Sequence, residues 1–353
     1  MLLFTCECLA FEQQWQIDAG YNWRHEHAFL QDDDRISIRY NIEKEFSNGR
    51  IAAHYQLGYL HSEGYIPQGD DRYRVDDLND YLIESSLSQN LDRLFLQYYF
   101  HNADITIGRQ AISLGLARFS SNVDVFYPTL IGALQTDYRS GVDAIRFEHM
   151  ISMDVRGLSL IDGAWLGDQQ GYARLRSNIF STDIQFTHVR LQEDMATSFA
   201  LDGAYGSVGW WSVVNHLYSE ASSVSLHVAQ LGMDFSLHDF LYQAEWSQRE
   251  DEEMNRLNRF IDKGMLPFPD NRYVFLSVTY LSGVRSQFQA SVAHNIEKNS
   301  QLWSFIYQYS INKYWDAWLQ LNTNENLYAS SHSNGLSFSD YGHLISVNVK
   351  SVF

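Results

Sequence analysis

Apolar and polar residues alternate along most of this chain. The stretch WQIDAGYNWR (15–24) places apolar or aromatic residues on its odd positions and polar residues or glycine on its even positions. The same alternation recurs at 35–46, 301–311 and 314–322. A period of two residues sustained over about 8 positions predicts a strand with one apolar and one polar face. Because no segment shows a helical period, the pattern predicts an all-β chain.

The length of the expected strands favours a membrane barrel over a soluble sandwich. Strands of soluble proteins average roughly five or six residues, whereas those expected here have about ten, the length that crosses a bilayer at a tilt. Aromatic residues gather near the strand ends, and the polar faces carry Arg, Asp, Glu and Gln, as around a wet lumen. No run of about 18 apolar residues is present, so a closed barrel is the expected way to satisfy the backbone in lipid.

The links between the expected strands alternate in length. Short links are expected at 47–49, 101–104, 150–152, 179–182, 204–206, 237–239, 282–283 and 311–313, and longer ones at 25–33, 61–80, 117–138, 163–169, 192–196, 219–222, 251–271, 296–300 and 326–340. Tight periplasmic turns and longer external loops are typical of outer-membrane barrels. With 81–100 as one bent strand, residues 11–353 form an antiparallel up-and-down barrel of about eighteen strands, both ends periplasmic. Weak patterns at 152–162 and 196–204 leave about sixteen strands as the alternative.

Charge and cysteine usage narrow the function. The net charge is −18, which argues against a nucleic-acid partner because phosphate binding requires a basic face. Both cysteines, Cys6 and Cys8, lie within residues 1–10, so the mature chain is expected to hold no disulfide. Residues 1–10 resemble the remnant of a secretory signal peptide without its basic start. Either the start codon is misassigned or the segment is not a signal.

The alternation breaks in residues 104–116, DITIGRQAISLGL. Strict alternation would place Arg109 on the same lipid-facing side as Ile105 and Ile107, at a cost of about 2–4 kcal/mol near mid-membrane. We expect a bulge at Gly108 that turns Arg109 into the lumen and returns Ile112 and Leu114 to lipid. In the alternative, the strand sits lower and Arg109 reaches the interface. On the next strand Asp143 has lipid-facing parity near the external rim.

Three segments resemble porin-like outer-membrane proteins of Gram-negative bacteria. These are ITIGRQAISLG (105–115), NVDVFYP (122–128) and YRSGVDAIRFE (138–148), which are similar to segments of the alginate-export-like barrels and related, poorly characterised porins. The resemblance is close over about 94–148, and Leu114-Gly115 departs from the Trp-Gly of the family. It implies an outer-membrane channel of about eighteen strands and does not identify a substrate.

Parity predicts which residues line the lumen. The expected pore-lining set is Arg24, Arg35, Arg39, Arg93, Arg109, Arg146, Arg174, Arg176, Arg285, Asp18, Glu43, Glu245 and Asp316. An excess of arginine in a pore favours anionic or polyhydroxylated solutes; alternatively, these charges only cross-pair inside a plugged barrel. Loop 117–138 has an apolar centre that includes Phe126, Tyr127, Leu130 and Ile131. We expect it to fold inward and constrict the pore, the alternative being packing on the rim or a partner subunit.

The sequence therefore predicts a porin or substrate-selective diffusion channel in the outer membrane, without cofactor, metal or covalent chemistry. The alternatives are a sealed structural, adhesion or envelope-assembly barrel and an outer-membrane enzyme. His332-Ser333 and the pair His25 and His27 are weak signals for catalysis and metal binding. Expected partners are membrane lipid and lipopolysaccharide, small solutes and a possible second copy. Terminal Phe353 resembles the signal read by the outer-membrane insertion machinery.

Overall fold

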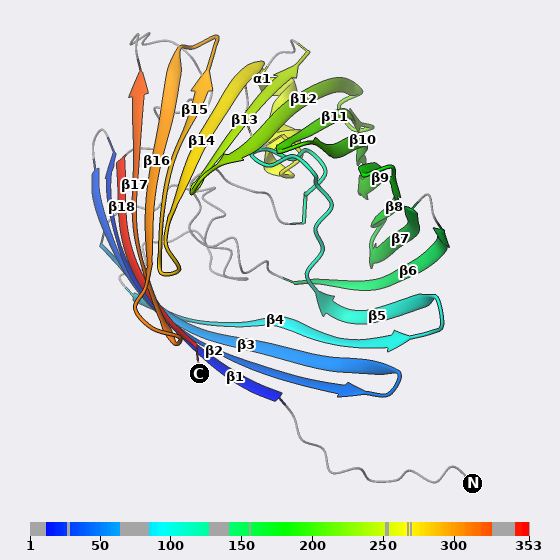
Figure 1. The fold of residues 1–353 in the computed structure, drawn as a ribbon, viewed down its shortest axis with the longest axis horizontal. Helices are drawn as coiled ribbons and strands as arrows, with labels where there is room; N and C mark the ends of the chain where they lie inside the picture. Colours follow the sequence, from blue (N-terminus) through cyan, green and yellow to red (C-terminus); the bar gives the residue numbers. More distant parts are fainter. Residues whose placement is uncertain are drawn as a thin grey trace.

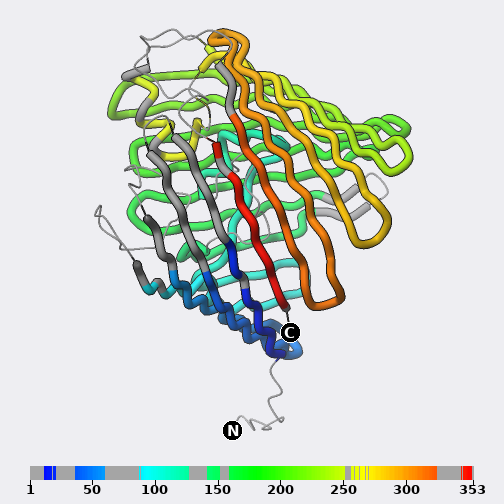
Figure 2. The backbone as a smooth tube through the Cα atoms, turned by 90° about the vertical axis from the view of Figure 1, so that its left-hand side faces the viewer, coloured from blue at the N-terminus to red at the C-terminus, as the bar shows by residue number. Residues whose placement is uncertain are grey.

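The chain forms a closed antiparallel barrel. The computed structural model describes residues 12–26, 29–63, 85–126, 141–154, 157–250, 254–266, 268, 270–326 and 343–352. Eighteen strands form one sheet, and the sheet closes because β1 (Glu12–Glu26) pairs with both β2 and the last strand, β18 (His343–Val352). Figure 2 shows the tilted strands of this seam side by side. The predicted eighteen-stranded barrel is confirmed.

The remaining strands follow one another around the barrel (Figure 1). They are β2 (Phe29–Phe46), β3 (Gly49–Glu63), β4 (Ser85–Tyr99), β5 (Ala103–Gln110), β6 (Val142–Asp154), β7 (Gly157–Gly167), β8 (Gln170–Ile179), β9 (Thr182–Leu191), β10 (Asp194–Tyr205), β11 (Val208–Ser219), β12 (Val224–Leu237), β13 (Phe240–Arg249), β14 (Arg272–Ser282), β15 (Ser286–Asn295), β16 (Ser300–Ser310) and β17 (Trp315–Asn326). One helix, α1 (Met254–Asp262), follows β13. The barrel end where β1 begins and β18 ends is called the terminal end below, and the opposite one the loop end.

The alternation of the sequence becomes an apolar outward face and a polar inward face. On β2, Ile36 and Ile38 are 52% and 40% exposed, whereas Ser37 and Arg39 are buried. Exposed Phe, Leu, Ile and Val side chains recur on the outward face of strand after strand, which is the arrangement of a barrel embedded in lipid. Among the described residues, no helix is long and apolar enough to cross a membrane.

Several local expectations were wrong. Strand β7 extends to Gly167 and β10 begins at Asp194, so the links after β7 and β9 are turns of two residues rather than longer loops. A helix was not expected at all, although Leu257, Phe260 and Ile261 have the i, i+3, i+4 spacing of a buried helical face. Charged residues surround these three apolar positions, so the sequence of 251–271 resembles that of an exposed loop.

The bulge in this part of the wall lies at Asp92 and not at Gly108. The β3–β4 register passes from His54↔Arg93 to Tyr55↔Leu91 and leaves Asp92 as the extra residue. The registers of β5 with β4 and β6 run through Gly108 without a shift. Gly108 is instead required because its φ is +115° and because a Cβ there would collide with the carbonyl oxygen of Leu94.

Strand β5 is short because the chain leaves the wall after Gln110. Ile112 and Leu114 were expected on the lipid-facing side, but both are buried inside the barrel. Residues 111–126, called the inner loop below, follow β5 into the interior, where Figure 1 shows them running inside the ring of strands toward α1. An apolar residue at every second position fits either destination, since lipid and a protein core are both apolar.

Candidate functional site

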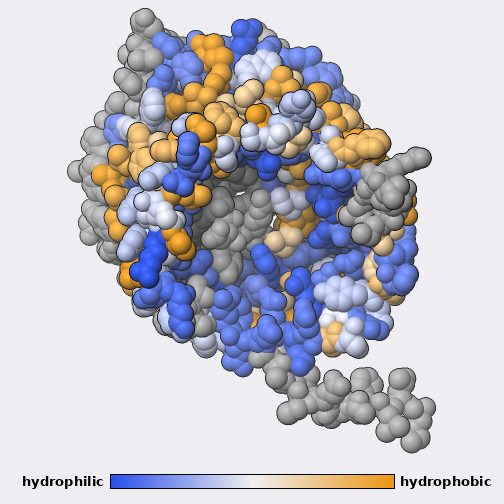
Figure 3. All heavy atoms as spheres, viewed as in Figure 1, coloured by the Kyte–Doolittle hydropathy of each residue, from blue (hydrophilic) through white to orange (hydrophobic). Residues whose placement is uncertain are grey.

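The inner loop covers an apolar patch on the inward wall. Its residues Ile112, Leu114 and Val123 are buried in a cluster that lies inside the barrel. The wall side of the cluster comes from β6 to β12, and helix α1 with the residues after it contributes Leu257, Phe260, Met265 and Leu266. The interior of this barrel therefore contains a hydrophobic core of its own on one side, and Figure 3 shows a hollow that remains in the middle of the molecule.

One buried carboxylate fastens the inner loop to the wall. Glu245 of β13 accepts hydrogen bonds from the backbone N–H groups of Arg118 (3.0 Å) and Phe119 (3.4 Å). It also accepts from the hydroxyl of Ser120 (3.1 Å) and from the indole Nε1–H of Trp211 (2.8 Å). Glu245 was expected to line the pore; it has the expected inward orientation, but it is 2% exposed and lies under the inner loop.

The approach of Trp211 to Glu245 depends on a glycine between them. Trp211 of β11 is the cross-strand partner of Gly232, and Gly232 is the partner of Glu245 on β13. A Cβ at Gly232 would collide with the Trp211 ring, so only glycine lets the indole lie across β12 and reach the carboxylate.

Further wall side chains bind the backbone of the inner loop. Arg174 donates to the carbonyl of Ser113 (2.8 Å), Gln185 to that of Leu114 (2.6 Å) and Gln230 to that of Ser120 (2.8 Å). Within the loop, the backbone N–H of Leu114 donates to the carboxylate of Asp124. These bonds come from β8, β9 and β12 and hold the loop in one position along its described length.

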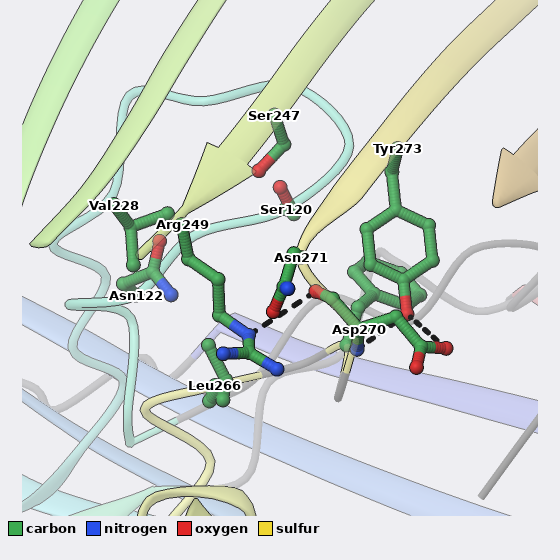
Figure 4. A pocket seen from close by; sticks show the side chains of 10 residues that line it. Ser120, Asn122, Val228, Ser247, Arg249, Leu266, Asp270, Asn271 and Tyr273 are labelled. Atoms are coloured by element: carbon green, nitrogen blue, oxygen red, sulfur yellow. Dashed lines mark hydrogen bonds between the residues drawn. The ribbon is translucent and has the colours of Figure 1, made fainter. Parts of the chain in front are cut away.

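The segment around α1 docks on the same side of the barrel. Arg259 of the helix donates to both carboxylate oxygens of buried Asp194, at 2.8 Å each. The Asn122 amide of the inner loop donates to the carbonyl of Met265 (2.8 Å), which joins the two inserted segments. Figure 4 shows the small cavity beside this junction, where Arg249 donates to the backbone carbonyl of Asp270.

Three arginines predicted from parity meet on the inward wall of β6 and β8. Buried Asp162 of β7 accepts two hydrogen bonds from Arg174, at 2.9 Å each. Arg146 and Arg176 both donate to Glu148, at 2.9 and 2.8 Å. Asp104, the cross-strand partner of Glu148, lies on the same face near Arg146, so three carboxylates accompany the three guanidinium groups of this cluster.

A second basic group lies on the inward wall of β2 to β4. Arg39 forms an ion pair of 2.9 Å with Asp92, the bulged residue of β4. The bulge lets both Asp92 and Arg93 avoid the outward face. The Nε of Arg93 is buried and has no hydrogen-bond partner among the described residues. Its cross-strand partner His54 bonds Glu43 at 2.9 Å.

Arg109 does not reach the lumen. It lies on the outward face with Ile107, opposite Leu94 and Asp143. Its guanidinium forms a two-point ion pair with Asp143, with N–O distances of 3.1 and 2.9 Å, and also donates to the carbonyl of Leu91. The outward position is tolerated because neither charge lacks a partner.

The other predicted residues are dispersed. Arg285 lies exposed beyond the end of β14 at the terminal end and not in the lumen. Asp316 has inward parity and is the cross-strand partner of Lys350. Phe126 of the inner loop packs near Tyr172. Outside the described residues or side chains lie Asp18, Arg24, Arg35, Tyr127, Leu130, Ile131 and Phe353, together with His25, His27 and His332-Ser333.

Sequence reasoning missed the partners of the arginines. Asp92 and Asp162 neutralise Arg39 and Arg174, yet neither carboxylate was among the predicted lumen residues. Asp162 falls on a strand whose pattern is weak, because Gly163 and Ala164 interrupt it. The inward parity of Asp162 opposite Arg174 was the signal available. Asp92 could not be placed, since a bulge shifts parity without a sequence mark.

Below the inner loop, toward the terminal end, the inward wall becomes acidic. Asp183 and Asp202 are direct cross-strand partners, an arrangement in which like charges repel. Arg118 of the inner loop relieves this repulsion through an ion pair of 3.0 Å with Asp202. Among the described residues, no group of three or more His, Cys, Asp or Glu side chains is placed to hold a metal ion.

Comparison with known proteins gives a likeness of fold. No protein-family model and no curated protein sequence matches the chain. OccK5 (OpdH) of Pseudomonas aeruginosa matches with a TM-score of 0.65 at 10% identity, over 97% of this chain and 98% of that one. OpdK of the same organism (0.64, 9% identity) and OccAB4 of Acinetobacter baumannii (0.64, 8% identity) each match over 98% of this chain and 99% of theirs. The porin-like barrel fold is thus shown, whereas these neighbours do not support the alginate-export-like assignment.

Proposed function

We propose that this chain is an outer-membrane channel that passes small anionic or polyhydroxylated solutes. The observation that carries the proposal is a closed barrel, apolar outside and polar inside, with a loop fixed within its lumen. A loop of this kind narrows the pore but need not close it. The side chains around the narrowed part then set the selectivity for solutes. The terminal end would face the periplasm and the loop end the exterior.

The basic groups of the inward wall supply the solute contacts in this proposal. Each guanidinium has five N–H donors in a fork that matches carboxylates. The side chains of Arg146 and Arg176 are 28% and 35% exposed, so they keep donors accessible while sharing Glu148. OpdK, one of the proteins with this fold, has been crystallised with vanillate, a small anion, and the match to that structure has a TM-score of 0.62 at 8% identity. That similarity supports a solute channel here.

Planar-bilayer recording of the full chain tests the proposal. We expect stable single-channel currents with a preference for anions. The double variant Arg146→Gln/Arg176→Gln should lower that preference, whereas the matched variant Arg272→Gln/Arg285→Gln, which changes arginines outside the lumen, should not. An unchanged preference in the first variant would refute the role of these arginines, and absence of current under every condition would refute the channel.

A sealed barrel is the second candidate, and one observation favours it. The hydrophobic core inside the barrel resembles that of a plug more than that of a mobile gate. In that case the wild-type chain would carry no current, but loosening the inner loop would open a path. An enzymatic role has no support among the described side chains, and we propose that the chain performs no covalent chemistry. Lipid, the insertion machinery and a second copy of the chain remain proposed partners.

A further inference from the structure

Three outward-facing histidines form one cross-strand row on β9 to β12. His188 is the direct partner of Thr197, Thr197 of His216, and His216 of His227. The rings of His216 and His227 stack with centroids 4.8 Å apart. Since neighbouring strands lie about 4.8 Å apart, the row presents its three imidazoles within about 15 Å.

The row lies at the border of the apolar band, on the loop end. His188 and His216 stand three residues before the last residues of their strands, Leu191 and Ser219. The next outward residues toward the terminal end are Phe186 and Val214, which are 48% and 50% exposed. Under the orientation proposed above, this border lies at the outer surface of the membrane.

Neighbouring side chains hold the three rings in place. The Nδ1 of His188 bonds the hydroxyl of Thr197 at 2.9 Å, and the Nε2 of His216 bonds that of Ser225 at 2.9 Å. The Nδ1 of His227 bonds the carboxylate of Glu250 at 3.0 Å. Hydrogen bonds from the side chain and the backbone N–H of His227 lower the pKa of the Glu250 carboxyl. Because each ring bonds through one nitrogen, the other can face the surroundings.

The opposite border has different chemistry. At the terminal end the outward residues of the same part of the wall are aromatic, including Phe180, Tyr205 and Phe240, as in an ordinary interfacial girdle. The two leaflets of an outer membrane also differ, since the outer leaflet consists of glycolipid whose phosphates lie near this border. On β9 to β12 themselves, the cross-strand row of imidazoles lies only at the loop end, which matches that difference.

We propose that the histidine row, His188, His216 and His227, docks the phosphate groups of the outer-leaflet glycolipid. The inference rests on the outer-membrane location proposed above but not on conduction. Arg190, the next outward residue of β9, adds a cation; its Nε donates to the carbonyl of Gln192, and Glu220 lies 3.8 Å from its guanidinium. Charged hydrogen bonds to phosphate are the strong kind.

Docking should strengthen as the pH falls. Imidazole gains its charge between about pH 8 and pH 5, where phosphate stays anionic. Among the described residues, the charged groups that face the row are Arg190, Glu220 and Glu250, and Arg272 lies on the neighbouring β14. Of the two acids, Glu250 is occupied by His227, so protonation of the row leaves positive charge available for the lipid.

The test measures lipid retention by the full chain in detergent. Bis-phosphorylated lipid A is titrated at about pH 5.5 and about pH 7.5 and followed by native mass spectrometry. The wild-type chain should bind several-fold more tightly at the lower pH. The variant His188→Gln/His216→Gln/His227→Gln should lose roughly tenfold in affinity and its dependence on pH. Lipid A without phosphates should bind weakly to both.

The control variant is His101→Gln/His149→Gln/His238→Gln, which changes three histidines near the terminal end. It should bind like the wild type. Equal binding of the row variant and the wild type, equal binding of the dephosphorylated lipid, or an equal loss in the control would overturn the proposal. The single variant His216→Gln serves if the triple variant does not fold. If the row variant loses lipid binding but keeps the conductance of the wild type, the lipid site is shown to be independent of the proposed channel function.

Discussion

At the scale of single residues, Glu245 joins the wall to the inner loop through four hydrogen bonds. Glu245→Ala removes a buried acceptor from all four donors, and each bond to a charged group contributes about 1.5–3 kcal/mol. We expect the loop to detach locally, the conductance to rise or become noisy, and the midpoint of thermal unfolding to fall. Single-channel recording with a parallel melting curve measures both effects.

Glu297→Ala is the matched control, since Glu297 lies in the turn after β15 and 4.0 Å from Arg272, away from the inner loop. It should leave conductance and melting unchanged. If Glu245→Ala instead behaves like this control, the carboxylate does not hold the loop.

The outward ion pair of Arg109 and Asp143 supports a prediction in which a second substitution restores the stability lost through the first. Asp143→Leu removes the carboxylate partner of Arg109 on the lipid-facing side, at a cost of up to about 2–4 kcal/mol. The double variant Arg109→Leu/Asp143→Leu removes both charges and should regain most of that loss, because leucine suits the apolar band. Urea unfolding in lipid vesicles gives the comparison. A double variant that is as unstable as the single one would show that the pair does not face lipid.

Residue parity was a good guide to orientation only while the register was regular. Arg39, Arg146 and Arg174 lie on the inward face, where alternation with the outward Ile38, Ile145 and Leu175 places them. Arg109 does not, because its aspartate partner made the outward position tolerable. Sequence alternation reports the face of a residue but not its ion-pair partner on the next strand.

At the scale of elements, the bulge in β4 decides which face several residues take. On the loop side of the bulge, Leu87 is outward and 72% exposed, and on the other side Leu94 and Leu96 are outward too. A regular strand could not place all three outward, since 87 and 94 differ in parity. The extra residue, Asp92, restores the outward position and supplies the partner of Arg39.

Deletion of Asp92 should therefore be more harmful than its neutralisation. Removing the residue turns one side of β4 over and points leucines into the lumen. We expect poor assembly into vesicles, seen as a loss of the folded band in gel-shift assays. Asp92→Asn keeps the length of the strand and removes only the charge, so it should assemble and lose some stability. Normal assembly of the deletion variant would contradict the register.

The positions of the inner loop and of α1 could not be predicted from the sequence. Residues 111–116 alternate like a strand, but their apolar side chains pack on the inward wall instead of lipid. The two destinations are equally apolar, so the choice depends on the hydrogen-bonding side chains of β8 to β13. Those groups are distant in sequence, and no local pattern reports them. Helix α1 was hidden because only a few of its residues are apolar.

At the scale of the whole molecule, the described contacts of the inserted segments are spread unevenly around the barrel. Their described hydrogen bonds and apolar contacts reach β6 to β16, with Phe119 stacked on Phe275 of β14. The strand number and closure followed from the alternation of the sequence. The placement of the inserted segments inside the barrel could not be predicted in this way, because it depends on contacts between the inner loop and strands that are distant in sequence.

The final prediction concerns the path of solutes. If the inserted segments fill the side of β8 to β16, solutes should pass along the inward faces of β17, β18 and β1 to β6, where they meet Arg146. Cysteines placed at Asn322 or Asn348 should then react with a charged thiol reagent added during recording and reduce the current. Cysteines at Gln185 or Asn215, which lie under the inner loop and bond Leu114 and Asn122, should not.

The natural cysteines Cys6 and Cys8 are replaced by serine in every variant, so that the reagent acts only at the introduced position. Unreactive cysteines at Asn322 and Asn348 together with reactive ones at Gln185 and Asn215 would place the path on the other side. A path on that side would reach the cluster of Arg146 and Arg176 from β8, whereas the predicted path reaches it from β6. The same experiment therefore decides from which side solutes approach this cluster.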